Sequence, residues 1–423
     1  MRSRWMPSRT PGWDSGSSGS GTYFVPEPLP PPLPSAPPAP ASIPHGWYPD
    51  PWGVAHYRWW DGHAWAANVA YFHGTGTAPA GRRRPRLPAF LSVPVLVCGL
   101  LALPFIALAA VFEPLVLALA LVPLVFIVPV LVWIDRLEPE PWASRAHAFL
   151  WGGTVAVVGA VLVNSVVLLT AGEAATAVIS APLVEETMKG LGILWAVRRR
   201  EVDGPVDGIV YAGWVAAGFA MIENIEYFFV ASDDGVLAET FVARALLTPF
   251  AHPLFTVWIG LAIGLAVSRR WRLPWAALWG WAIAVLLHAG WNGAIVASID
   301  LDDDRILVVA AVAFVAIFAL TIVLVALVRR RERRDYVAAM PYVAHRYQVP
   351  PEEVGMFSTW GEMLSLRRRL PRAQRRRFDD LHAALARLAA LHARPGAIDP
   401  ADEQRLAQQL AAARAAMRPA PPR

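Results

Sequence analysis

The chain has 423 residues, of which 56% are hydrophobic and 17% are charged, and its mean hydropathy is +0.40. These values exceed those of a soluble globular protein and predict a polytopic membrane protein. The net charge of +5 does not indicate nucleic-acid binding, because the arginines cluster beside apolar stretches, where the positive-inside rule accounts for them. The single cysteine, Cys98, excludes an intramolecular disulfide.

The N-terminal region carries no membrane-length apolar stretch. Residues 1–45 are rich in Ser, Gly and Pro and are expected to be disordered. Residues 46–70 form a Trp-rich module in which Asp61-Gly62, between two aromatic runs, predicts a small β-hairpin. Its GWYPDP and RWWDG segments resemble a short domain of unknown function found in membrane proteins. Its histidines lack a ligand-like spacing, so packing of aromatic side chains is favoured over a metal site. Residues 71–87 are expected to be a basic linker.

Residues 88–330 predict an all-α bundle of about eight transmembrane helices, because eight apolar stretches are long enough to cross a hydrocarbon core of about 30 Å. They lie at 88–111, 115–134, 148–171, 173–197, 205–230, 240–267, 274–298 and 305–328. The first two are joined so tightly, through Phe112-Glu113-Pro114, that one kinked helix or a re-entrant pair is an alternative. The alternation of charge between the connections favours two separate spans.

The connections differ sharply in charge. Arginines precede the first span and follow spans two, four, six and eight, whereas the other connections are neutral or acidic, as at Asp300-Leu301-Asp302-Asp303-Asp304. This pattern predicts a multi-pass protein of the cell membrane with both termini in the cytoplasm.

The C-terminal region, residues 331–423, is rich in Ala and Arg. Apolar residues recur at helical spacing between Leu381 and Leu391, which predicts a helical cytoplasmic tail, with a hairpin broken at Pro395-Gly396. The arginine runs 367–369 and 372–377 fit a solvated helix face or contact with anionic lipid headgroups.

Polar residues interrupt two of the predicted spans. Glu185, Glu186 and Lys189 lie in the fourth span, and Glu223 with Asn224 lies in the fifth. A carboxylate inside the bilayer costs at least a few kcal/mol, so it indicates a functional site. Lys189 is the only lysine among 38 lysine and arginine residues, and its spacing places its ammonium on the helix face of both glutamates. The alternative is an ion pair that merely makes the glutamates tolerable.

Two histidines extend this candidate site. His252 and His288 lie in the sixth and seventh spans, and the rise of about 1.5 Å per residue places them at a depth similar to that of Glu185 and Glu223. Asn292 lies one turn from His288. In the fifth span, small residues recur every four positions from Gly208 to Ala220, which permits close helix packing.

At these residues the chain resembles the PrsW family of intramembrane proteases, within the superfamily that includes the CAAX prenyl proteases. The resemblance covers residues 133–295. Its motifs are Asp135-Arg136-Leu137-Glu138-Pro139-Glu140-Pro141, EExxK at Glu185, Glu186 and Lys189, Asp207-Gly208, FxxxEN at Phe219, Glu223 and Asn224 with Tyr227, then His252, and HxxxN at His288 and Asn292. The CAAX relatives have His where this chain has Glu223, which separates it from prenyl-protein processing.

The resemblance implies amide hydrolysis by an activated water molecule. It implies Glu185 as the general base, Glu186 as its partner or a helix-to-helix anchor, and His252 and His288 as groups that orient water or donate a proton. Glu223 would share the proton. The accessory residues are Lys189, Asn224, Tyr227 and Asn292, of which Asn292 can donate to the developing oxyanion.

The cofactor and partners are implied less directly. If a metal takes part, it is zinc held by His252, His288 and Glu223, but the sequence lacks HExxH, and a metal-independent reaction is favoured. The implied substrates are single-span membrane proteins such as anti-sigma factors, cleaved toward the extracytoplasmic side. Two other classes are a proton- or cation-coupled transporter and a non-catalytic membrane scaffold. The sequence shows no inverted repeat, which disfavours the transporter.

Overall fold

The structure is a computed structural model. It describes residues 46–49, 57–60, 63–70, 91–269, 271–349, 360–393 and 400–417. The chain divides into two units, residues 1–84 and 85–423.

The first unit contains a three-stranded antiparallel sheet in the order β1-β2-β3. Its strands are β1 (Gly46–Pro49), β2 (Tyr57–Trp60) and β3 (Trp65–Ala70). Trp60 pairs with Trp65 across β2 and β3, with ring centroids 5.2 Å apart in an edge-to-face arrangement. The predicted hairpin therefore corresponds to β2 and β3, and β1 adds a strand to it, while Asp61-Gly62 lies outside the described residues.

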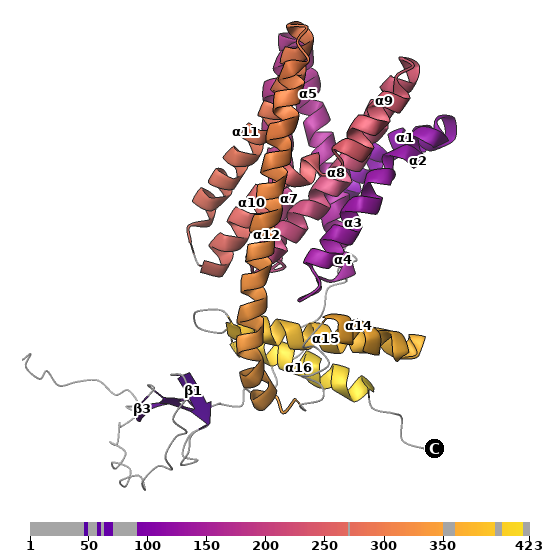
Figure 1. The fold of residues 1–423 in the computed structure, drawn as a ribbon. Helices are drawn as coiled ribbons and strands as arrows, with labels where there is room; N and C mark the ends of the chain where they lie inside the picture. The colour runs from indigo at the N-terminus through magenta and orange to yellow at the C-terminus, as the bar shows by residue number, and fades with distance from the viewer. Residues whose placement is uncertain are drawn as a thin grey trace, which may run out of the picture. The chain divides into compact units, whose positions relative to one another are not determined.

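In the second unit, the described residues form helices joined by short non-helical segments (Figure 1). Its membrane-region elements are α1 (Val93–Phe112), α2 (Pro114–Ala120), α3 (Val122–Ile134), α4 (Trp142–Trp151), η1 (Gly152–Ala156), α5 (Val157–Ala171), α6 (Glu173–Ala175), η2 (Thr176–Ser180), α7 (Ala181–Arg198), α8 (Pro205–Asp233), α9 (Leu237–Phe241), η3 (Val242–Leu247), α10 (Ala251–Arg269), α11 (Leu273–Asp300) and α12 (Arg305–Arg346). The elements η1, η2 and η3 are π-helical turns.

Seven helical segments in the described part of the chain are long and apolar enough to cross a membrane. They coincide with seven of the eight predicted spans, which confirms an all-α, multi-pass membrane protein. The remaining predicted span, 173–197, is helical over Glu173–Arg198 as α6, η2 and α7. It is less apolar than the others because Glu185, Glu186 and Lys189 lie on it.

The first two predicted spans are separate helices. Glu113, with φ −131° and ψ 60°, is not helical and ends α1, and Pro114 begins α2. Residues on both sides of this turn, Ala109 and Val116, are buried in one apolar cluster with Ile225 and Phe228 of α8.

Helix α8 lies at the centre of the bundle and is buried along most of its length. Asp207 fixes its start, because the carboxylate accepts the backbone N–H groups of Asp203 and Gly204 at 3.0 and 2.8 Å. A Cβ added at Gly208 would lie 2.0 Å from the carbonyl oxygen of Gly260 on α10, and the reverse substitution meets Gly208 at the same distance. The small-residue stripe thus brings α8 and α10 into backbone contact, as predicted.

The predicted sixth span is interrupted. Thr248 has φ −125° and ψ 38°, and a non-helical segment, 248–250, separates η3 from α10. The residue before a proline avoids the helical region, and Pro249 follows Thr248 here. His252 consequently lies in the first turn of α10 rather than inside a continuous helix.

The segment between α3 and α4 joins two buried carboxyl groups. Asp135 accepts the backbone N–H of Glu140 and pairs with Arg145 at 3.3 Å, while Glu140 accepts the hydroxyl of Tyr211 on α8 at 3.0 Å. Burial raises the pKa of Asp135 to about 7, although the charge of Arg145 opposes the shift. Burial also raises the pKa of Glu140 to about 8, with the nearby Asp135 adding to the rise.

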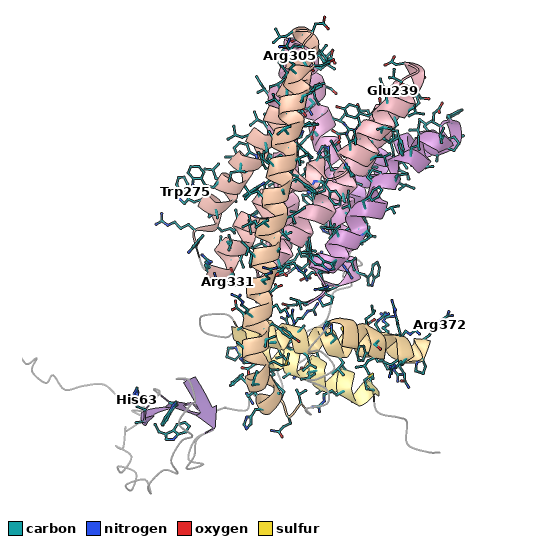
Figure 2. All side chains as sticks on the ribbon, in the orientation of Figure 1. His63, Glu239, Trp275, Arg305, Arg331 and Arg372 are labelled. Carbon is teal, nitrogen blue, oxygen red and sulfur yellow. The ribbon has the colours of Figure 1, made fainter. Side chains whose placement is uncertain are left out.

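The described residues of the C-terminal tail are mainly helical, as predicted. Helix α12 continues past the predicted span end to Arg346, because the Arg- and Ala-rich sequence favours helix. It is followed by α14 (Trp360–Arg369), α15 (Arg372–Ala393) and α16 (Pro400–Met417). Leu381, Leu385 and Leu388 are buried between these helices, and Pro395-Gly396 lies outside the described residues. Arg331 lies at the end of the bundle toward α14–α16, and Arg305 lies at the opposite end (Figure 2).

Candidate active site

Helix α7 supplies the central ion cluster. Because residues three and four apart share a helix face, Lys189 contacts both glutamates, with its Nζ 3.2 Å from Glu185 Oε2 and 2.9 Å from Glu186 Oε1. All three side chains are buried. The ammonium also lies 3.9 Å from the ring centroid of Phe219 on α8, a cation–π contact. The first motif is therefore joined to the second through Lys189.

His252 bridges this cluster and Glu223. Its Nδ1 lies 3.1 Å from Lys189 Nζ, and its Nε2 lies 2.7 Å from Glu223 Oε2. A lysine ammonium can only donate, so Nδ1 accepts, and Nε2–H donates to the carboxylate. The neighbours of His252 thus select one tautomer.

Glu186 links three helices. Its Oε2 accepts the hydroxyl of Thr256 on α10 at 2.8 Å, and its Oε1 lies 3.3 Å from His288 Nδ1 on α11. His288 stacks on Phe255, with ring centroids 4.9 Å apart. Sequence reasoning did not identify Thr256, and a threonine in an apolar helix gives no signal that would single it out.

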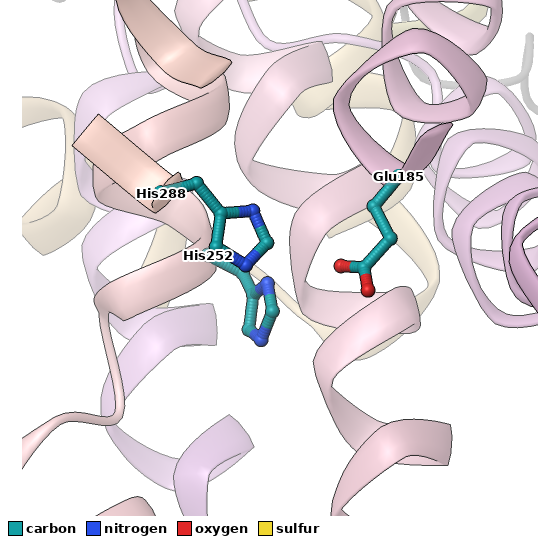
Figure 3. A group of neighbouring side chains, drawn as sticks. All are labelled: Glu185, His252 and His288. Atoms are coloured by element: carbon teal, nitrogen blue, oxygen red, sulfur yellow. The ribbon is translucent and has the colours of Figure 1, made fainter. Parts of the chain in front are cut away.

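Three potential metal ligands converge from three helices (Figure 3). Glu185, His252 and His288 each offer one ligand atom, and these atoms lie within 4.8 Å of one another. Two imidazoles and one carboxylate form a donor set found in catalytic zinc sites. The set includes Glu185 rather than Glu223, so it differs from the one that the sequence favoured for a metal.

The formal charges of the clustered groups do not balance. Three carboxylates, on Glu185, Glu186 and Glu223, contact two basic side chains, Lys189 and Arg244. With neutral histidines this leaves one excess negative charge, which a bound proton or a metal cation would offset.

Arg244, on η3, is a further member of the site. Its guanidinium donates to Glu223 Oε2 and, through Nε, to Asn224 Oδ1 at 2.8 Å, and it lies 3.7 Å from the ring centroid of Tyr227. Sequence reasoning missed it. The signal was present, because Arg244 is a charged residue inside the predicted span 240–267.

Asn292 does not contact the ion cluster in this structure. Its amide donates to the carbonyl of Ala177 in η2 at 2.9 Å, which ties α11 to the segment that precedes α7. It nevertheless lines the same cavity, of about 290 Å³, as the histidines. The predicted residues on the wall of this cavity are Glu223, Asn224, Tyr227, His252, His288 and Asn292.

The arrangement provides the groups that hydrolysis requires. Glu185 faces two imidazoles, and these imidazoles line a cavity large enough for several water molecules, although Glu185 itself is not on the cavity wall. These groups can hold a water molecule and accept its proton. Their burial lowers the local dielectric, so each charge acts more strongly on a reacting group than it would in water.

Comparison with known proteins agrees with the residue motifs. Residues 140–338 match the family model described as PrsW family intramembrane metalloprotease. The chain is 38% identical over 151 residues to Protease PrsW of Geobacillus kaustophilus, an alignment that covers 34% of this chain and 64% of that protein. It is 32% identical over 183 residues to Protease PrsW of Clostridioides difficile, covering 39% of this chain and 75% of that protein. No solved structure matches the chain significantly.

Proposed function

Because the chain belongs to the PrsW family of intramembrane proteases, we propose that it is an endopeptidase that cleaves membrane proteins within the bilayer. The observation that carries this proposal is the convergence of Glu185, His252 and His288 from three helices, with both histidines lining one cavity. Burying these ionisable side chains inside a membrane protein is costly, which indicates a functional role, and activation of water is a role that they can perform.

Two chemistries use these three residues. Without a metal, Glu185 accepts a proton from water, and the imidazoles orient that water or protonate the leaving amine. Glu185, His252 and His288 could instead hold a zinc ion, if Nδ1 of His252 were released from Lys189, and zinc would make water nucleophilic near neutral pH. The donor set of two imidazoles and one carboxylate supports the metal-dependent chemistry over the metal-independent one that the sequence favoured.

The remaining residues position these groups. Lys189 pairs with both Glu185 and Glu186, and Glu223 accepts the Nε2–H of His252. Glu186 fixes α7 against α10 and α11 through Thr256 and His288. Asn292 would reach a developing oxyanion only after releasing the carbonyl of Ala177.

We further propose that both termini are cytoplasmic and that the cavity opens toward the extracytoplasmic side. Arg200 lies 3.9 Å from Asp402 of α16, and Arg331 lies at the end of the bundle toward α14–α16. Asp300 ends α11, and Asp302 follows it, near Arg305 at the opposite end of the bundle. The cavity is lined by Ile299, beside that acidic end. The substrates are then single-span membrane proteins of the anti-sigma-factor type, cleaved in the outer half of the bilayer. The protease domain would comprise residues 88–330, with the Trp-rich module and the helical tail outside it.

Cleavage of a single-span reporter in proteoliposomes tests the proposal. Wild type should release a fragment, and Glu185→Gln or His252→Ala should reduce the rate at least about 100-fold, since each removes a group that contacts the reacting water. Matched controls are Glu239→Gln and His345→Ala, both exposed and neither among the residues that line the cavity. Full cleavage by Glu185→Gln would refute the assignment, and ion transport without cleavage would point to a transporter.

The metal content of the purified protein separates the two chemistries. The donor set predicts about one zinc per chain in wild type, with loss of zinc in Glu185→Gln and His288→Ala and retention in Glu223→Gln. Loss of zinc in Glu223→Gln but not in Glu185→Gln would favour the set that the sequence suggested. Full cleavage by metal-free protein would establish the metal-independent reaction.

A further inference from the structure

Arg244 lies where an apolar residue would be expected. It belongs to η3, inside a predicted membrane span, and is followed by the non-helical segment 248–250 that leads to His252. An arginine in this position is expensive unless its charge is paired. Its partners therefore show what it does.

All three partners of Arg244 lie on one turn of α8. The guanidinium donates to Glu223 and Asn224 and covers the ring of Tyr227. Two directed hydrogen bonds and a stacked ring fix a planar guanidinium far more tightly than a lysine could be fixed. The segment before the break is thus locked to α8 beside Glu223.

Glu223 connects this lock to the reacting groups. The oxygen that accepts from Arg244, Oε2, also accepts Nε2–H of His252 at 2.7 Å. Arg244 precedes the non-helical segment 248–250 and His252 follows it, so one carboxylate oxygen joins the two helical parts on either side of the break. The hydrogen bond at Nε2 leaves Nδ1 of His252 as the acceptor on the side of Lys189.

We propose that Arg244 is a positioning residue, which holds Glu223 so that His252 keeps its Nε2–H tautomer and presents Nδ1 toward Lys189 and the reacting groups of the site. This inference rests on the proposed function. This role differs from simple neutralisation of the Glu223 charge, because a residue that only neutralised that charge would need no directed hydrogen bond to Asn224. Removal of a residue that holds a metal-ligating side chain in place through a hydrogen bond typically lowers activity by about 10- to 100-fold.

The first test is a kinetic double-mutant cycle on the full chain. Arg244→Met should lower kcat by about 10- to 100-fold with KM within about twofold of wild type, because Arg244, although it lines the cavity, would act through Glu223 and His252 rather than on the substrate. Arg244→Lys, which keeps the charge but not the fork, should recover part of kcat. Adding Arg244→Met to Glu223→Gln should cause little further loss, because both act through one oxygen. Arg305→Met, at an arginine exposed at the end of α12, is the matched control.

The second test measures the tautomer of His252 directly and does not depend on enzymatic activity. Nitrogen-15 NMR of histidine-labelled protein, with the His252 signal assigned by its loss in His252→Ala, should show the Nε2–H tautomer in wild type and in Arg244→Lys. Arg244→Met should lose that preference. If Arg244→Met does not fold, Arg244→Lys alone still tests the proposal, through its lowered kcat and unchanged KM.

The outcomes separate the two proposals. Wild-type kcat in Arg244→Met, a change in KM alone, or additive losses in the cycle would overturn the role of Arg244 while cleavage by wild type leaves the protease function intact. An unchanged His252 tautomer in Arg244→Met would overturn it as well. Failure of wild type to cleave any reporter would instead refute the proposed function, and the NMR result would still decide the role of Arg244.

Discussion

Replacement of Lys189 by methionine should destabilise the protein strongly. The ammonium is fully buried, lies within 3.2 Å of two carboxylates, and contacts the face of Phe219. Methionine fills a similar volume, so the main effect is two buried carboxylates without their cation. Removing one partner of a buried ion pair costs about 3–5 kcal/mol. At about 2–4 °C per kcal/mol for a domain of this size, Tm should fall by about 6–20 °C.

Thermal unfolding in detergent, followed by tryptophan fluorescence, measures this effect, since the chain has 19 tryptophans. The double variant Glu186→Gln with Lys189→Met should regain part of the lost stability, because one of the two unpaired charges is then gone. Arg305→Met, at an exposed arginine, should leave Tm unchanged. A Tm for Lys189→Met within about 2 °C of wild type, or a double variant less stable than the single one, would refute the reasoning.

Two further predictions concern packing and pH. Gly260→Ala should lower Tm by several degrees and reduce cleavage, because its Cβ would lie 2.0 Å from a backbone oxygen of α8, whereas Gly290→Ala, with no atom within 4 Å of its Cβ, should change neither. Equal effects of the two would contradict the packing. Glu140, buried against Tyr211, has its pKa raised from 4.5 to about 8, so the folded state holds its proton more strongly than the unfolded state does. The unfolding free energy should therefore fall as pH rises from about 4.5 to about 8, and thermal unfolding across this range should show a weaker pH dependence in Glu140→Gln.

The helices were largely predictable because membrane spans depend on local sequence. About 20 apolar residues suffice to make a span, and the backbone of each span satisfies its own hydrogen bonds. The predicted span 240–267 shows where this signal fails, since hydropathy does not register the break at 248–250 that Pro249 causes. In the same way, hydropathy ended the last predicted span at residue 328 and could not show that α12 continues to Arg346.

The chemistry-bearing residues were also visible in the sequence, because charged groups are rare inside apolar stretches. That signal selected Glu185, Lys189 and Glu223, and applied evenly it would have selected Arg244 too. The same signal could not identify Thr256, which donates to Glu186, because threonine is common in apolar helices.

The sequence alone thus determined which residues are polar within the spans, and it related Glu185 to Lys189 because one helix turn fixes their separation. Only the tertiary structure decided which of them meet across helices. It placed His252 between Lys189 and Glu223, and it grouped Glu185, rather than Glu223, with the two histidines. The physical reason is that contacts between helices depend on how each helix is rotated and where it is broken, and here close glycine packing of α8 on α10 and the interruption before His252 set both.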